Sequence, residues 1–176
     1  MKQYSFTAFL LILLAISALN GGSVNALHYF YLVHQVFPEV TDLYIMIDKD
    51  RLASEMSKIQ SGSAQYSIKT SVYDAENQVD IGKAIRDMKE NSYVVIYDDQ
   101  IFLEKKNMMY ILSKCTERQI SIITSSREYI EAGALLGYID DGGSKKIVLN
   151  LKHYEHLKEK FTVEFIQKVG IHEVIS

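Results

Sequence analysis

The chain has 176 residues, with 19 Lys and Arg against 22 Asp and Glu, and it holds one cysteine and one proline. A single cysteine excludes an intramolecular disulfide and a cysteine-based zinc site. The slightly acidic, evenly mixed charge argues against nucleic acid or an anionic membrane surface as a partner. The length suits one domain with a hydrophobic core of its own.

The first 26 residues have the layout of a cleaved secretory signal. Lys2 supplies a positive start, residues 9–16 are an uninterrupted apolar run, and Val24 and Ala26 occupy the two positions that a signal peptidase reads. Counted with its less apolar flanks, the segment is about 11–14 residues long, short of the roughly 20 that cross a bilayer, so removal is preferred to a retained anchor. We therefore expect a signal peptide at 1–26 and one periplasmic or secreted domain at 27–176.

Beyond the leader, apolar runs and helical spacings alternate along the chain. Residues 27–40 are aromatic and apolar and fit either a first helix or a strand-like arm. The elements expected after them are a strand at 42–47, a helix from 49 to a turn at 61–63, a strand at 65–73, a helix at 79–88, a strand at 93–97, a helix at 101–115, a strand at 120–124, a short helix from 127 to 132, strands at 134–139 and 146–151, and a helix-like tail from 153.

This alternation predicts an α/β fold, a three-layer sandwich with a mainly parallel sheet. Ligands of such sheets bind beyond the carboxyl ends of the strands, where the strand order reverses. The polar residues expected there form a candidate ligand-binding rim, comprising Asp48, Asp98, Asp99, Ser125 and Ser126. Tyr97 and Tyr129 should lie near the same rim, and tyrosines left exposed there would suit a protein interface.

Each rim group also has a structural interpretation. Asp98 and Asp99 could bind a cation or act as acid and base, but neighbours on a strand point to opposite faces, so a helix cap by one of them is favoured. Asp48 is a plausible cap for the helix after it. Ser125 or Ser126 could cap the helix from 127, or the free N–H groups there could hold an anion.

No sequence pattern points to catalysis or to a cofactor. The serines lack a G-x-S-x-G elbow, and no Walker A or G-x-G-x-x-G loop is present in the sequence. Cys115 falls in the apolar pattern of a predicted helix, so we expect a buried, inert thiol. We expect a protein that is not an enzyme and that needs neither cofactor nor metal.

Two segments carry a resemblance to a known family. Residues 123–138, with the sequence ITSSREYIEAGALLGY, and residues 147–152, with the sequence IVLNLK, resemble segments of ABC-transporter substrate-binding-like proteins in order and spacing. Full members have two lobes around a cleft and about twice the residues. The resemblance therefore implies a single periplasmic-binding-protein-like, Rossmann-like lobe that binds a small ligand without transforming it.

The same ending is also similar to a family of small periplasmic repressors of membrane diguanylate cyclases, which matches the mature length better. That resemblance implies a regulator that docks on the exported part of a membrane signalling enzyme. The expected partners are thus a small-molecule ligand, a membrane protein or a second copy in a homodimer, and no nucleic acid.

Overall fold

Seven strands form one sheet in the order β2-β1-β3-β4-β5-β6-β7. The computed structural model describes residues 24–176, so the apolar run of the leader lies outside the described residues. Neighbouring strands are parallel except β5 and β6, which are antiparallel. The strands are β1 (Asp42–Asp48), β2 (Lys69–Ala75), β3 (Tyr93–Ile96), β4 (Ser121–Thr124), β5 (Leu136–Asp141), β6 (Ser144–Asn150) and β7 (Ile171–Ile175).

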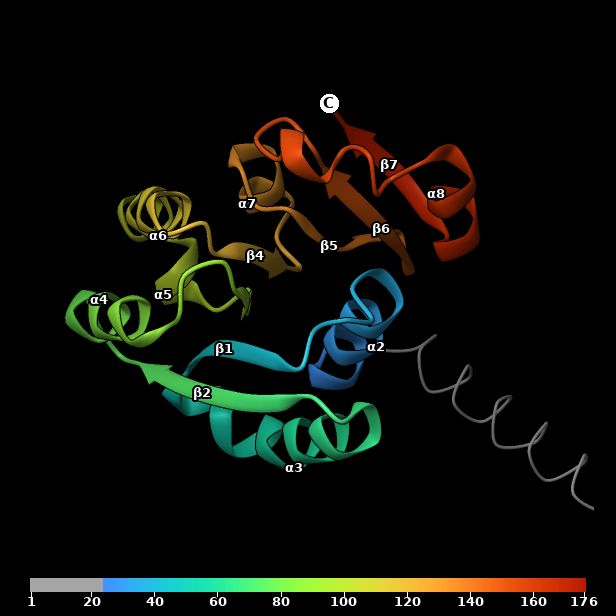
Figure 1. Cartoon of the computed structure of the whole chain (residues 1–176). Helices are drawn as coiled ribbons and strands as arrows, with labels where there is room; N and C mark the ends of the chain where they lie inside the picture. The colour runs from blue at the N-terminus through green and yellow to red at the C-terminus, as the bar shows by residue number, and fades with distance from the viewer. Residues whose placement is uncertain (1–23) are drawn as a thin grey trace, which may run out of the picture.

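Helices cover both faces of this sheet, which confirms the predicted three-layer α/β architecture (Figure 1). One face carries α2 (Ala26–Val36), α3 (Lys49–Tyr66), α8 (Val163–Val169) and a 3-10 turn (Glu155–Leu157). The other carries α4 (Gln78–Asp87), α5 (Gln100–Leu103), α6 (Lys105–Glu117) and α7 (Arg127–Ala132).

The central strands are apolar throughout because both of their sides are covered. Along β3, Val94 and Ile96 belong to the core cluster beneath α4 and α6, whereas Val95 belongs to the cluster beneath α2. Successive side chains of a strand point to opposite faces, so a continuous apolar run fills both cores at once.

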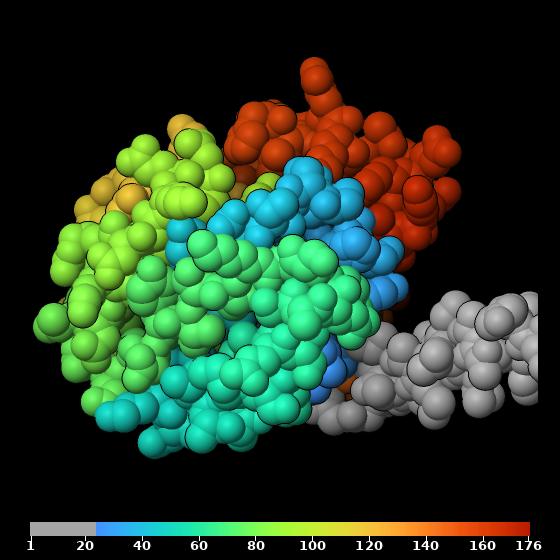
Figure 2. Space-filling model, turned by 60° about the horizontal axis from the view of Figure 1, so that its bottom comes forward, coloured from blue at the N-terminus to red at the C-terminus, as the bar shows by residue number. Residues whose placement is uncertain are grey.

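The segment predicted as either a helix or a strand-like arm is a helix, α2, and its N-terminus is capped by side chains. The side chain of Asn25 accepts a hydrogen bond from the backbone N–H of Leu27, and a capping box with His28 completes the N-terminus of the helix. α2 packs beside α3, as the space-filling view also shows (Figure 2). Of the two conformations that the sequence left open, the helix is therefore the one adopted.

Residues 61–63 are not a turn, contrary to the prediction. α3 continues through them to Tyr66, and its C-cap Ser67 takes a left-handed conformation with φ of 55°. A glycine occupies position 62 within the helix because the ring of Phe30 from α2 packs directly against the backbone there and leaves no room for a side chain. The following strand consequently starts at Lys69 rather than at residue 65.

Two later elements also differ from the prediction. The helix expected at 101–115 is divided into α5 and α6, since the backbone leaves the helical region at Glu104. The tail is not one helix: it forms the 3-10 turn, α8 and the edge strand β7. Gly170, with φ of 77°, ends α8 and directs the chain into β7.

Candidate functional site

The predicted rim exists at the carboxyl edge of the sheet, at the point where the strand order reverses. From β1 the chain passes to β2 on one side and then crosses to β3 on the other. Asp48 ends β1, Asp98 and Asp99 follow β3, and Ser125 follows β4. The backbone N–H of Asp48 donates to Oδ2 of Asp99 at 2.8 Å, which joins the ends of β1 and β3.

Arg51, from the first turn of α3, occupies the centre of this rim. Its Nη1 donates to Oδ1 of Asp98 at 2.7 Å and to Oδ1 of Asp99 at 2.9 Å. Its Nη2 donates to the carbonyl of Val24 at 3.1 Å. Burial alone would lower the pKa of Arg51, but the hydrogen bonds to Asp99 and Asp98 raise it above its ordinary value. The guanidinium is thus a permanent cation held by three acceptors.

The carboxylates of Asp98 and Asp99 converge, which corrects the interpretation of one of them as a helix cap. Asp99 occupies the N-cap position of α5, but its side chain makes no capping hydrogen bond. β3 ends at Ile96, so residues 97–99 are free to turn and both carboxylates reach the same guanidinium. The Asp98 side chain keeps 43% of its surface exposed, against 9% for Asp99.

A buried carboxylate lies beneath this rim. Glu55, only 4% exposed, accepts hydrogen bonds from the hydroxyl of Tyr97 at 3.1 Å and from the backbone N–H of Ala26 at 2.9 Å. Its other oxygen, Oε1, forms a salt bridge with Nζ of Lys58 at 2.5 Å. Burial, and then the charge of Glu55, raise the pKa of Tyr97, so this hydroxyl stays protonated and donates.

Two tyrosine rings connect the rim to β4. The guanidinium of Arg51 lies over the Tyr97 ring, 4.6 Å from its centroid, and Tyr29 of α2 meets the same ring edge to face at 5.3 Å. The hydroxyl of Tyr29 donates to Oγ of Ser125 at 2.9 Å. Ser125 is therefore joined to the Arg51 cluster through aromatic contacts, although it does not touch the carboxylates.

The remaining predicted rim residues have structural partners. Ser126 caps α7 by accepting from the N–H of Tyr129, and Asp48 caps α3 by accepting from the N–H of Asp50; both caps were among the predicted alternatives. Tyr97 and Tyr129 are completely buried, so neither offers an exposed ring to an interface at the rim. Tyr129 packs in the core beneath α6 and donates to the carbonyl of Phe102 at 2.9 Å, away from the Arg51 cluster.

Sequence reasoning missed Arg51, Glu55 and Tyr29. Glu55 had a detectable signal: it falls between Leu52 and Ile59 at helical spacing, on the face of α3 that turns towards the core. A carboxylate on an apolar stripe requires polar partners, so it points to a buried network. Arg51 and Tyr29 had no comparable signal, because their partners lie 47 and 96 positions further along the chain.

Two of the motif residues behind the family resemblance, Gly137 and Asn150, have structural roles. Gly137 leaves no room for a side chain, since a Cβ there would lie 1.9 Å from the carbonyl oxygen of Thr124. Asn150 is fully buried, and its Nδ2 donates to the carbonyl of Ile130, which ties the end of β6 to α7. Neither residue contacts the Arg51 cluster in the interactions of residues 24–176. Over the same residues, no three His, Cys, Asp or Glu side chains gather as metal ligands.

Comparison with known proteins identifies the fold. No known family and no curated protein matches the sequence. Among solved structures, the chain is similar to a conserved domain protein from Vibrio cholerae, with a TM-score of 0.71 and 13% identity over 85% of this chain and 60% of that one. It is also similar to an ABC domain in complex with L-Trp from Streptococcus pneumonia, with a TM-score of 0.68 and 13% identity over 86% and 62% of the two chains.

A third similar structure is the ligand-free, open form of a substrate binding protein with adhesive properties from Clostridium difficile, with a TM-score of 0.65 and 14% identity over 87% of this chain and 60% of that one. These similarities confirm a periplasmic-binding-protein-like α/β fold. The chain spans about 60% of the length of these neighbours.

Proposed function

We propose that this protein is an exported, non-catalytic binding module that recognises its target at the rim formed by Arg51, Asp98, Asp99 and the residues around them. The observation that carries the proposal is the position of this charged cluster at the reversal of strand order between β1 and β3. In parallel α/β sheets this is where ligands bind. The fold shared with substrate-binding proteins supports the same assignment.

Binding fits the rim better than catalysis does. Both carboxylates are held by Arg51, which remains charged at any working pH. Carboxylates held by a guanidinium offer directed hydrogen bonds, and the exposed side of Asp98 is free to make them.

The target is a small molecule or a protein surface. Ligand pockets normally enclose most of their ligand. Among the described residues, Asp98 at the rim keeps 43% of its side-chain surface exposed, so a partner's surface can reach it from solvent. A protein target of this kind is the basis of the alternative function, a repressor-like regulator that docks on the exported part of a membrane signalling enzyme.

A thermal-shift experiment on the exported protein tests the first function. A ligand that binds only the folded state raises Tm as its concentration exceeds Kd. The panel contains the common L-amino acids, because one neighbour is a complex with L-Trp, together with sugars and organic acids. A concentration-dependent rise in Tm supports small-molecule recognition; no shift with any compound argues against it.

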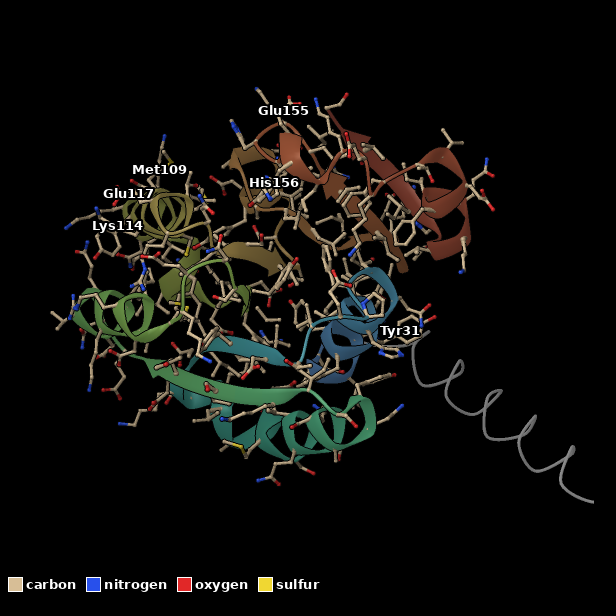
Figure 3. The ribbon with its side chains drawn as sticks, viewed as in Figure 1. Tyr31, Met109, Lys114, Glu117, Glu155 and His156 are labelled. Atoms are coloured by element: carbon tan, nitrogen blue, oxygen red, sulfur yellow. The ribbon has the colours of Figure 1, made fainter. Side chains whose placement is uncertain are left out.

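Matched variants locate the binding surface. Asp98→Asn keeps the shape of the side chain and removes its charge, so it should weaken binding about tenfold or more, roughly 1.4 kcal/mol. Glu117→Gln is the control: Glu117 is an exposed carboxylate paired with Lys114 on the outer side of α6 (Figure 3). Equal effects of the two variants would refute the assignment of the rim.

For the regulatory alternative, the tagged protein is crosslinked in its native host and recovered from solubilised membranes. Specific recovery of a membrane protein with a cyclase domain by the unaltered chain and by E117Q, but not by D98N, supports docking through the rim. Recovery that is the same with D98N would remove the rim from that interaction.

A further inference from the structure

The three residues Val24, Asn25 and Ala26 belong to the folded domain. The Val24 side chain is 7% exposed and lies in the core cluster beneath α2, and its carbonyl is one of the three acceptors of Arg51. Asn25 supplies the N-cap of α2. The backbone N–H of Ala26 donates to the buried carboxylate of Glu55. Val24 and Ala26 therefore contact the residues of the rim and of the carboxylate beneath it, and Asn25 holds the start of α2.

Cleavage after Ala26, as the leader pattern predicts, would remove every one of these contacts. Arg51 would lose an acceptor, Glu55 would lose a donor, and α2 would start without its capping side chain. A buried polar group that loses its partner costs the full desolvation of that group. The sequence pattern and the packing thus disagree on where the mature chain begins.

From this disagreement we infer that the exported chain begins at Val24, through cleavage of the Ser23–Val24 bond by a signal peptidase. Gly21 and Ser23 are small residues at the two positions that the enzyme reads, in the same relation as Val24 and Ala26. Water hydrolyses the amide, which leaves a carboxylate on Ser23 and an ammonium group on Val24. The inference rests on the exported location in the proposed function and does not depend on what the rim binds.

The new amino terminus has a defined place in the fold. Because the Val24 carbonyl is bonded to Arg51, the ammonium group on the same residue appears beside the reversal of strand order, next to the candidate site. A terminal amino group has an ordinary pKa of about 7.7–8.0 and adds a titratable cation there. Cleavage after Ala26 would place no such group beside the Val24 contact.

The experiment expresses the full chain with a C-terminal tag in a secreting bacterial host and determines the mass and N-terminal sequence of the exported protein. A first residue of Val24 is expected. A start at Leu27, a start upstream of Val24, or an intact leader would each overturn the inference. The thermal-shift panel on the same sample reports on the rim separately, so failure of one result leaves the other interpretable.

A substitution before the described residues gives a second readout. Ser23→Leu places a large side chain at the position before the inferred cut and leaves residues 24–176 unchanged. It should reduce the amount of chain starting at Val24 at least tenfold and cause the precursor to accumulate. If the exported chain keeps the same first residue in the same yield with Ser23→Leu, the Ser23–Val24 bond is not the site.

Discussion

Gly62→Ala should destabilise the protein, although alanine is the better helix former. Gly62 lies in α3, where a glycine costs about 1 kcal/mol relative to alanine. A Cβ built at this position would lie 2.3 Å from Cδ2 and 2.7 Å from Cγ of Phe30. Phe30 is fully buried, so its ring cannot swing into solvent to make room.

The steric effect should exceed the gain in helix propensity. Adding a methyl group to a packed interface costs about 1–3 kcal/mol, and contacts this short place the cost at the upper end. After subtraction of the propensity gain, we expect a net loss of about 1–2 kcal/mol and a fall in Tm of about 2–8 °C. Urea denaturation and a thermal melt followed by circular dichroism measure both quantities.

Ser61→Ala is the matched control, because Ser61 is exposed one residue earlier in the same helix. It should raise stability by up to about 0.5 kcal/mol through propensity alone. If Gly62→Ala is as stable as the unaltered protein or more so, then α2 does not pack against α3 through Phe30 in the way the structure shows.

Four further outcomes follow from the packing and the charges. A chain that starts at Leu27 should be less stable than one that starts at Val24 by about 3 kcal/mol in urea denaturation, since it lacks one helix cap and one buried valine; equal stability would show that the segment contributes nothing. Burial raises the pKa of the Cys115 thiol to about 12, so iodoacetamide should label it at mildly alkaline pH only after unfolding, and rapid labelling of the native protein would contradict its burial. Arg118→Met should cost about 2 kcal/mol, measured by urea denaturation, because the guanidinium donates to three backbone carbonyls at the end of α4. Burial raises the pKa of Tyr97 above its usual value of 10.0, so this tyrosine stabilises the fold fully below pH 10.0 and its contribution is lost as the pH rises further; the part of the tyrosine absorbance change that is absent in Tyr97→Phe should therefore coincide with alkaline unfolding, and its appearance before unfolding would contradict the burial of Tyr97.

The fold was predictable because its central strands coincide with short apolar runs in the sequence. β1, β3 and β4 each bury most of their residues. The first helix and the tail were harder to predict, since their conformations depend on partners far along the chain. Phe30 packs on Gly62, and β7 becomes a strand by pairing with β6.

The rim was predictable in position but not in its interactions. Parallel topology alone placed Asp48, Asp98 and Asp99 at one edge. That the two carboxylates converge could not be foreseen, because it follows from the guanidinium of Arg51 and not from strand geometry. The burial of Tyr97 could not be foreseen either, since its hydroxyl is satisfied by Glu55, from a helix that precedes it by two strands.

The C-terminal unit of α8 and β7 buries few of its residues. α8 has no buried residue, and β7 lies at the edge of the sheet with only Ile171 fully covered. Amide hydrogens in such a unit exchange with solvent through local opening, without unfolding of the central strands. We therefore expect α8 and β7 to exchange their amide hydrogens faster than the buried central strands that position the rim.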